Sequence, residues 1–410
     1  MKLGVFFESQ SSSGGGFYLA QTKLEALINS IDSKKEIICF VTNKDTKDSL
    51  KKKFTNIKIE IFQVNIFIKF LLFLYTISFI KKILYKIKLR NPFENKLINN
   101  DIELLFFISP SSFVRFCEKI NFVYNIWEVQ HRSIPYFPEY SDKKYSQSSY
   151  ELREESYEFA VKRAFKIIVD TEKSAQDIIK NYNCSRDNLF EVQPFVPSLP
   201  KYYERVKEKS NFKEIFSKLN LPNKKILFYP AQFWPHKNHI YLIDSFKNLL
   251  KNNIDEYILV FTGRDRGNKE YILKTIEKNN LKNEIIIFDF LKLEEIIALY
   301  KYSFALIMTT LVGRSSLPLR EAFYFELPVF YSKDLLDKSY SKFVNELDLN
   351  DPSSLSNYLK SANSNQNLEL IKSAKEFYLE TCSDKAIIKS NKNVIKEYEN
   401  YSKYWQERNL

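Results

Sequence analysis

The 410-residue sequence contains few of the residue types that build disulfides, metal sites and flexible loops: four cysteines, three histidines and seven glycines. The cysteines are widely separated, with no CxxC pair and no cysteine–histidine ladder; they are Cys39, Cys117, Cys184 and Cys382. This spacing argues against a disulfide framework or a structural zinc site, and it suits a reducing compartment. Because histidine and glycine are scarce, the places where they do occur are informative.

Long uncharged apolar runs are also lacking. The longest one in the most apolar region, 70–80, is shorter than the ~17–25 residues that a helix needs to cross a bilayer. The first residues turn polar too quickly for a secretory signal. We therefore expect a cytoplasmic protein.

Residues 64–90 form an apolar stretch whose charges are all basic. No acidic residue occurs from Ile61 to Phe93, and the stretch carries Lys69, Lys81, Lys82, Lys86, Lys88 and Arg90. Two interpretations are open. One is a helix that lies at the inner face of the cell membrane, with its basic residues meeting anionic lipid. The other is a buried helix with a basic exposed end.

The formal net charge is +12 and the isoelectric point is about 9.1. This balance favours an anionic partner, which includes nucleic acid, a nucleotide or an acidic membrane surface. A general bias of the chain toward Lys, Ile, Asn and Phe explains part of the charge equally well. No nucleic-acid recognition motif accompanies it, so we do not expect a nucleic-acid partner.

Strand-like runs alternate with helical stretches along the whole chain, which predicts parallel sheets covered by helices on both faces. Pro194, Pro197 and Pro200 interrupt this pattern and suit a stiff hinge. We predict two doubly wound, Rossmann-like α/β domains that face a central cleft, over 1–195 and 196–383. A polar helix over 384–410 is expected to pack back on the first domain.

Six of the seven glycines fall in three loops that follow predicted strands. These are Gly14–Gly16, the pair Gly263 and Gly267, and Gly313. Glycine permits close approach of the backbone to a ligand, and a glycine loop that enters a helix presents N–H groups to an anion. The spacing matches neither GxGxxG nor a P-loop. A plain tight turn is the alternative for Gly14–Gly16.

The segment after Gly313 predicts a helix that begins near Leu317 and Pro318, with Ser315 or Ser316 as its cap. The free N–H groups at such a helix start would face a diphosphate. Glu321 lies one turn further on, where a carboxylate can accept two hydrogen bonds from a ribose diol. The alternative is a capped helix with an exposed glutamate.

Two other segments hold all three histidines. Tyr229–His239 follows a predicted strand and contains His236, Lys237 and His239. The Lys237 ammonium can neutralise a phosphate, and the two histidines can cap or hydrogen-bond nearby; their spacing is weak evidence for a metal site. His131 follows another strand and can stabilise charge at a reacting centre, or it is structural.

At these residues the chain resembles the GT-B-fold, retaining glycosyltransferases of family 4. The resemblance covers most of the chain in layout and is specific only in segments. Gly14, Gly15 and Gly16 match the glycine loop of the family, His131 its first-domain histidine, and Lys237 its diphosphate-binding lysine. Gln232 stands where the family has an arginine. Glu321 matches the second of two paired glutamates, and Gly313 replaces the first, as in a variant subgroup.

The resemblance implies transfer of a sugar, usually a hexose and mannose among them, from a nucleoside-diphosphate sugar to a hydroxyl group. The acceptor would be a glycan or a lipid-linked glycan of a surface polysaccharide such as lipopolysaccharide. His131, Lys237 and Glu321 would be catalytic, and no metal or other cofactor is implied. With Gln232 uncharged, Arg264, Arg266 or Arg314 would meet the diphosphate. The amides of Ser315, Ser316 and Leu317 and the backbone at Phe290 would complete the donor site, with Gly263 in a neighbouring loop.

Two other functions stay open at this point. A non-catalytic carbohydrate- or lipid-binding protein of the same fold is compatible with Gln232 and Gly313. A nucleotide-sugar epimerase would need an acid and a base carboxylate in the cleft, and the sequence identifies no such pair.

Overall fold

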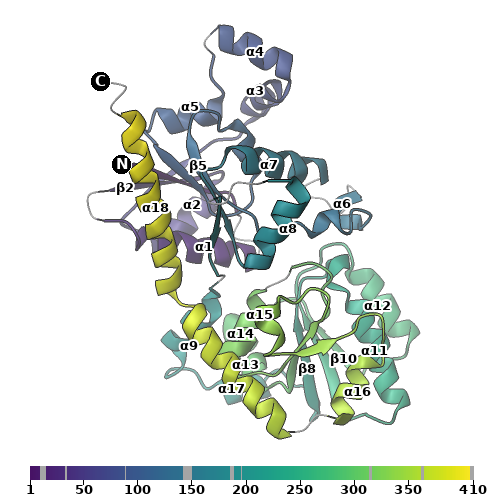
Figure 1. The fold of residues 1–410 in the computed structure, drawn as a ribbon. Coiled ribbons are helices and arrows are strands. Elements are labelled where there is room, and N and C mark those ends of the chain that lie inside the picture. The colour runs from purple at the N-terminus through teal and green to yellow at the C-terminus, as the bar shows by residue number, and fades with distance from the viewer. Residues whose placement is uncertain are drawn as a thin grey trace. The chain divides into compact units, whose positions relative to one another are not determined.

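The computed structural model describes residues 1–9, 15–32, 35–87, 89–141, 150–184, 189–194, 196–313, 316–361 and 364–406. The chain divides into two compact units (Figure 1). Unit 1 comprises Met1–Val129, Tyr150–Pro194 and Asp384–Leu410, and unit 2 comprises Gln130–Ser149 and Phe195–Ser383. Each unit is built on a parallel sheet with helices on both faces, so the predicted fold class is confirmed.

Unit 1 has a sheet of seven described strands in the order β3-β2-β1-β4-β5-β6-β7. The strands are β1 (Lys2–Phe7), β2 (Glu36–Val41), β3 (Lys58–Ile61), β4 (Leu104–Phe107), β5 (Asn121–Asn125), β6 (Lys166–Val169) and β7 (Phe190–Val192). Every neighbouring pair runs parallel, and Val5 of β1 is in register with Cys39 on one side and Phe106 on the other. The carboxyl ends of the strands therefore share one edge.

The helices of unit 1 lie on both faces of this sheet. They are α1 (Gly15–Ile28), α2 (Lys44–Lys53), α3 (Ile66–Thr76), α4 (Ser78–Lys86), α5 (Pro92–Ile98), η2 (Ser112–Phe116), α7 (Tyr150–Arg163), α8 (Glu172–Tyr182) and α18 (Asp384–Gln406). Thr171 caps α8, since its side chain accepts a hydrogen bond from the Ser174 N–H (3.1 Å).

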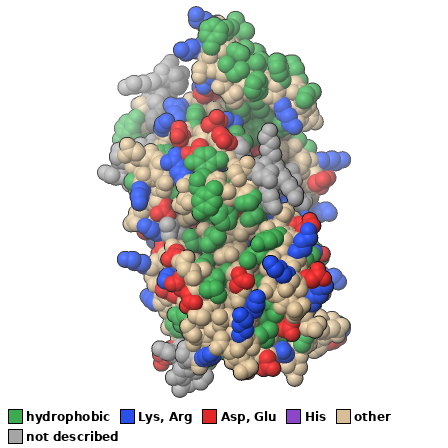
Figure 2. All heavy atoms as spheres, turned by 90° about the vertical axis from the view of Figure 1, so that its right-hand side faces the viewer, with side chains coloured by type: hydrophobic (Ala, Val, Ile, Leu, Met, Phe, Trp, Pro, Cys, Tyr) green, Lys and Arg blue, Asp and Glu red, His purple; other side chains and the backbone are tan. Residues whose placement is uncertain are grey.

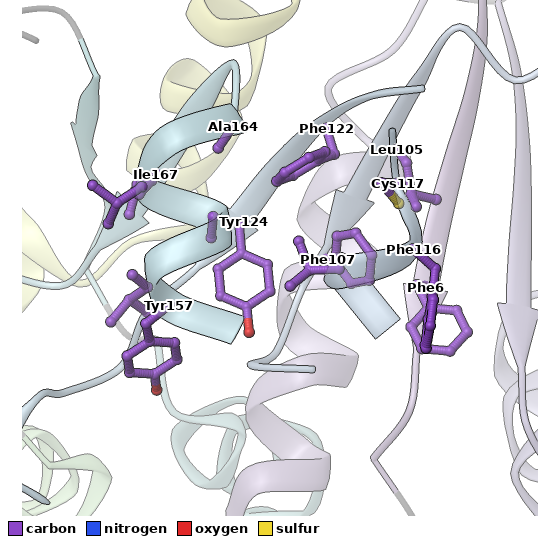
Figure 3. Packing of buried hydrophobic residues seen from close by; sticks show 14 of the residues in the cluster. Phe6, Leu105, Phe107, Phe116, Cys117, Phe122, Tyr124, Tyr157, Ala164 and Ile167 are labelled. Atoms are coloured by element: carbon purple, nitrogen blue, oxygen red, sulfur yellow. The ribbon is translucent and has the colours of Figure 1, made fainter. Parts of the chain in front are cut away.

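Alternate residues of the strands face opposite sides of the sheet. Phe6 and Phe107 lie in one core cluster with their rings edge to face, 5.7 Å apart, and Val5 and Phe106 lie in the other. Tyr124 shares the first cluster (Figure 3), and its hydroxyl donates to the Ser111 carbonyl (3.0 Å). Large apolar side chains on both faces are the reason why helices must cover both.

The C-terminal helix α18 packs on unit 1 against α1. Tyr398 donates a hydrogen bond from its hydroxyl to the Glu103 carbonyl (2.9 Å), and Glu397 pairs with Lys166 (2.9 Å). The predicted first domain, 1–195, included residues 130–149. In the structure these residues group with unit 2 instead. The physical reason is that Glu139 on α6 (Pro138–Ser141) accepts hydrogen bonds from His236.

Unit 2 has a second parallel sheet, in the order β10-β9-β8-β11-β12-β13 for its described strands. They are β8 (Lys225–Pro230), β9 (Tyr257–Thr262), β10 (Ile285–Phe288), β11 (Ala305–Met308), β12 (Val329–Ser332) and β13 (Asn345–Leu347). The helices are η3 (Gln130–Arg132), α6, α9 (Ser198–Val206), α10 (Phe212–Ser217), η4 (Pro235–Lys237), α11 (His239–Lys251), α12 (Lys269–Lys278), α13 (Leu293–Tyr302), α14 (Leu317–Phe325), α15 (Lys338–Ser341), α16 (Ser354–Ser361) and α17 (Ser364–Thr381).

The apolar basic stretch forms two helices where one was predicted. The Asn65 side chain caps α3 by accepting from the Ile68 N–H (2.8 Å), and Ile77 ends α3 in an extended conformation before α4 begins. Among the described residues, no helix combines the length and the apolar character that crossing a membrane requires.

Candidate functional site

The backbone of Lys237 is held at the carboxyl end of β8. Its carbonyl accepts hydrogen bonds from the hydroxyls of Tyr229 (2.8 Å) and Thr309 (3.3 Å). The Lys237 ammonium donates to Oγ1 of Thr310 (3.4 Å). Because Thr309 and Thr310 follow β11, the neighbour of β8 in the sheet, these bonds bring the ammonium to the loop that leads into α14.

The loop between β11 and α14 ends in the predicted helix start. Ser316 caps α14, and its hydroxyl accepts from the Leu319 N–H (3.3 Å). Pro318 lies in the first turn, where its missing N–H costs nothing. The start of the helix at Leu317 is thus confirmed, and the first-turn N–H groups form the positive end of its dipole. Arg314 and Ser315 lie outside the described residues.

Gly313 precedes this helix in the left-handed region, with φ +92°. Its carbonyl accepts a hydrogen bond from the Tyr331 hydroxyl (2.9 Å). A Cβ built on Gly313 would meet no atom within 4 Å. Space therefore exists beside position 313, and the conformation rather than crowding favours glycine there.

Glu321 is partly buried on α14 and accepts a hydrogen bond at Oε2 from the Tyr300 hydroxyl (2.7 Å). Burial raises the pKa of Glu321 to about 7, since desolvation outweighs the opposite effect of the Tyr300 bond. Burial also raises the pKa of Tyr300, with the nearby carboxylate acting in the same direction. Glu321 is thus a carboxyl group that changes charge close to neutral pH.

Gly263 lets two loops approach each other. A Cβ at this position would lie 2.4 Å from the Ala231 carbonyl oxygen and 2.7 Å from Cα of Gln232. Real Cβ atoms do not approach backbone this closely, so the loop after β8 and the loop after β9 can pack only with glycine here. The Phe233 N–H then donates to the Arg264 carbonyl (3.0 Å).

Gln232 and Arg266 are brought together by this packing. The side-chain oxygen of Gln232 accepts from Nε of Arg266 (3.2 Å) and from Nε1 of Trp234 (3.2 Å). The Arg266 guanidinium also lies over the Trp234 ring, 5.7 Å from its centre. Arg264 is exposed and contributes its backbone to the loop contact. Arg266 therefore places a cation beside the position where the resemblance expects an arginine.

His239 does not face a ligand. It is fully buried, and its ring lies among those of Tyr229, Phe233 and Phe261, with centres 4.9–5.1 Å away. Burial lowers the pKa of His239 to about 3, so its ring is neutral. Of the two suggested roles, capping or hydrogen bonding nearby, the second holds, since His239 bonds to the Ala231 backbone as a core residue under the loop.

His236 contacts a carboxylate that the sequence analysis did not single out. Oε1 of Glu139 accepts from the His236 N–H (2.9 Å) and lies against Nδ1 of the ring. No group of three or more His, Cys, Asp or Glu side chains that could hold a metal ion occurs within the described ranges.

His131 lies in η3, grouped with unit 2, and its side chain is fully buried. Its ring is tilted against that of Tyr140 on α6, with centres 6.0 Å apart. The structure therefore connects His131 to the helix that contacts His236.

In unit 1, the predicted glycine loop is in part the start of a helix. Gly15 and Gly16 form the first residues of α1, and Gly14 lies outside the described residues. A Cβ on Gly16 would meet the Trp127 ring at 3.5 Å, an ordinary contact. Glu8 follows β1, and burial raises the pKa of its carboxyl group against the effect of a bond to Ser111.

Phe290 lies between β10 and α13 with 72% of its side chain exposed. The preceding Asp289 pairs with Lys269 of α12. Phe290 therefore stands open at the same edge of the sheet as Gly263, since both follow the carboxyl ends of paired strands.

Sequence reasoning missed five residues of this site: Glu139, Trp234, Thr309, Thr310 and Tyr300. Thr309 and Thr310 directly follow the short apolar run of β11, so their position at the ligand edge could be inferred from the sequence. Tyr300 lies on a different helix from Glu321, and no spacing in the chain indicates that they meet.

Comparison with known proteins gives a match for part of the chain. Residues 211–341 match the family described as glycosyl transferases group 1, and this range lies within unit 2. A search of curated proteins gives no match. Among solved structures, the chain is similar to HepE of Anabaena in complex with UDP and glucose, with a TM-score of 0.70 and 13% identity over 98% of this chain and 100% of that chain.

Two further structures are similar to the chain. Sucrose-phosphate synthase from Thermosynechococcus elongatus gives a TM-score of 0.70 and 13% identity over 99% of both chains. WaaG, a glycosyltransferase involved in lipopolysaccharide biosynthesis, gives 0.65 and 12% over 96% of this chain and 99% of that chain. The fold is therefore that of the GT-B glycosyltransferases, and unit 2 carries the match to a glycosyltransferase domain.

Proposed function

We propose that this chain is a retaining glycosyltransferase that moves a sugar from a nucleoside-diphosphate sugar to a hydroxyl group of a glycan or lipid-linked acceptor. One observation carries the proposal. The Lys237 ammonium bonds to Thr310, in the loop that ends at the first-turn amides of α14, and Glu321 lies on that helix. The cation and the helix N-terminus can bind a diphosphate, and the carboxylate can accept hydrogen bonds from a ribose. Their position on adjacent elements therefore suits a nucleoside diphosphate.

The reaction follows from this arrangement. The bond between the anomeric carbon and the β-phosphate oxygen breaks, and negative charge develops on the departing diphosphate. Lys237, Arg266 and the amides at Leu317 stabilise that charge. The acceptor hydroxyl bonds to the anomeric carbon on the face that the diphosphate leaves, and its proton passes to a β-phosphate oxygen. No protein base is required. The resemblance gives His131 as the partner of the transferred sugar, and because this side chain is fully buried in the structure, that contact requires a rearrangement around η3.

The relatives indicate which donor and acceptor to test first. HepE is described in complex with UDP and glucose, which makes UDP-hexoses the first donors to try, with GDP-mannose next. WaaG is described as acting in lipopolysaccharide biosynthesis, which supports a lipid-linked surface glycan as the acceptor class.

Donor binding is proposed to need no metal, because Lys237, Arg266 and the α14 amides supply positive charge directly. Turnover should then be unchanged by excess EDTA. A loss of activity that Mg²⁺ or Mn²⁺ restores would contradict this part of the proposal.

The acceptor class agrees with a proposed contact between residues 64–90 and the inner face of an anionic membrane. Figure 2 shows hydrophobic side chains gathered at the top, where α3 and α4 lie. The exposed large apolar residues of this region are Ile66, Phe67, Phe70, Phe73, Ile77, Phe79, Ile83, Ile87 and Leu89. Soluble proteins rarely expose so many adjacent apolar side chains, and an interfacial helix pair requires them.

Not all basic residues of this stretch are available to bind lipid. Lys81 pairs with Glu118 of unit 1, and Lys88 lies outside the described residues. Lys69, Lys82, Lys86 and Arg90 are exposed. These four cations are the groups that can meet anionic lipid beside the apolar side chains.

Isothermal titration against UDP, GDP, dTDP and CMP, followed by turnover with the matching nucleotide sugars, tests the donor assignment. Lys237→Ala should weaken binding and reduce turnover about 100-fold or more, because it removes a group that stabilises the transition state. The matched control is Lys247→Ala on α11, an exposed lysine that bonds to Asn279 (2.8 Å). Binding without turnover would favour the non-catalytic alternative, and equal activity in both variants would reject the site.

A further inference from the structure

Glu139 is a buried carboxylate for which the proposed mechanism has no use. Its exposed fraction is 7%, and it lies on α6, a single helical turn. Oε1 accepts the His236 N–H at 2.9 Å and also contacts Nδ1 of the same ring. Burying a carboxylate is costly unless it is hydrogen-bonded. These two bonds therefore stabilise both the carboxylate and the contact between α6 and the loop after β8.

The carboxylate of Glu139 stays ionised. Burial would raise its pKa, but the bonds and charge of His236 act in the opposite direction and prevail, so the pKa of Glu139 is lowered. An ionised oxygen that binds both the backbone and the ring of one residue fixes the position and the orientation of that residue.

His236 is the residue at which the two diphosphate-facing loops join. Its carbonyl accepts from the Leu311 N–H (2.7 Å), in the loop that leads into α14. Its ring is stacked on that of Trp234, with centres 6.2 Å apart and an interplanar angle of 22°. The next residue is Lys237, whose ammonium bonds to Thr310. Any displacement of His236 would thus move Lys237 relative to the start of α14.

From this geometry we infer that Glu139 is a positioning residue: by holding His236 it places the Lys237 ammonium for the donor diphosphate. The inference rests on the proposed function. The residue after Glu139, Tyr140, packs against His131 (6.0 Å between ring centres), so the same turn of helix also orients the second catalytic candidate. An isolated turn has little stability of its own, so the bond to His236 helps to hold α6 in place.

The test is a comparison of Glu139→Ala and Glu139→Gln in steady-state turnover and in titration with the nucleoside diphosphate that binds the wild type. Glu139→Ala should lower kcat on the order of 10- to 100-fold, as small displacements of catalytic groups do, and Glu139→Gln should be intermediate. In a Lys237→Ala background, Glu139→Ala should cause no further loss of nucleoside-diphosphate affinity. Activity of Glu139→Ala within about twofold of wild type, or losses that add in the double variant, would overturn the inference.

A matched buried glutamate separates positioning from general stability. Glu94 is 1% exposed, and its Oε1 accepts the N–H groups of Glu118 (2.7 Å) and Lys119. Glu94→Gln should lower the melting temperature without changing kcat or KM. A kcat loss equal to that of the Glu139 variants would show that both act through the fold, and it would overturn the inference.

Substitution of His236 keeps the inference testable if Glu139→Ala does not fold. His236→Asn keeps a side-chain donor for Glu139 and should retain most activity, whereas His236→Phe keeps only the backbone N–H bond to Glu139 and should lose activity. Equal activity of the two variants overturns the inference. If the wild type neither binds a nucleoside diphosphate nor transfers a sugar, the proposed function is wrong, and the positioning role of Glu139 is wrong with it. If the wild type turns over and the Glu139 variants are unaffected, only the positioning role is wrong.

Discussion

The Tyr300 hydroxyl donates a 2.7 Å hydrogen bond to Oε2 of Glu321, and this bond joins helix α13 to helix α14. Glu321 is the carboxylate proposed to hold the ribose of the donor. Since burial raises its pKa to about 7, its charge is sensitive to pH in the range where the protein is assayed.

Donor affinity should therefore rise with pH and level off above about pH 7. Only the ionised carboxylate accepts both bonds from a ribose diol, so affinity should change by up to about tenfold per pH unit below the pKa of Glu321. Titration with an intact nucleotide sugar between pH 5.5 and 8.5 measures this, because its phosphates do not titrate there. A flat profile in the wild type would contradict the ribose assignment. In Glu321→Gln, the pH dependence should disappear.

The same group gives a prediction for stability. A carboxyl group whose pKa is about 7 in the folded chain and 4.5 when unfolded binds more protons in the folded state between these values. The free energy of unfolding should then fall as pH rises from about 4.5 to 7. In thermal unfolding, the stability of Glu321→Gln relative to the wild type should increase as pH rises across this window. A constant difference between the two proteins would contradict the raised pKa.

Removal of the Tyr300 hydroxyl should move the donor-binding profile. Tyr300→Phe deletes the bond that lowers the pKa of Glu321, so the midpoint should shift to higher pH. Tyr302→Phe is a control on the same helix, since Tyr302 is 41% exposed and its ring packs against Phe216. A shift toward lower pH in Tyr300→Phe would be the wrong sign for this account.

Arg266 should contribute more to diphosphate binding than Arg264. Its Nε bonds to the Gln232 side chain and its guanidinium lies over Trp234, so its position is fixed before the donor binds. Arg266→Ala is expected to weaken nucleoside-diphosphate binding about tenfold, as loss of a charge-assisted hydrogen bond does. Arg264→Ala, at an exposed side chain of the same loop, should have a smaller effect. The reverse order would assign the diphosphate to Arg264.

The two loop glycines should respond differently to alanine. Gly263→Ala places a Cβ 2.4 Å from the Ala231 carbonyl oxygen, so backbone must move, at about 1–3 kcal/mol, and Arg266 moves with it. Gly313→Ala meets no atom within 4 Å and costs about 1 kcal/mol for its positive φ. Denaturant unfolding and donor titration should both be more affected in Gly263→Ala. Similar losses in both variants would contradict the close-packing argument.

The basic and the apolar side chains of α3 and α4 should contribute separately to the binding of the protein to anionic vesicles. Changing Lys82 and Lys86 to Gln should weaken binding to phosphatidylglycerol vesicles by about 30-fold, at ~1 kcal/mol per cation, and leave binding to neutral vesicles unchanged. Changing Phe67, Phe70 and Phe73 to Ser should weaken binding to both. Tyr271→Ser, at a 58% exposed residue on α12, is the control. Unchanged partitioning of both sets of variants would remove the membrane contact from the proposal.

Local residue patterns predicted the elements of the fold because their signals act over a few residues. The strands Glu36–Val41 and Tyr257–Thr262 and the cap at Ser316 all follow from apolar runs and cap chemistry nearby in the chain. The break of the apolar stretch at Ile77 was missed, because the run of β-branched and aromatic residues fits one helix as well as two.

Residue patterns alone were enough to predict two parallel sheets and the loops rich in glycine, lysine and serine that follow their strands. Which side chains meet around those loops follows only from the folded chain: Gln232 with Arg266, Glu321 with Tyr300, and His236 with Glu139. The partners in these pairs are separated by 34, 21 and 97 residues. Backbone preferences do not reach across such distances, whereas the packing of neighbouring strands and helices does.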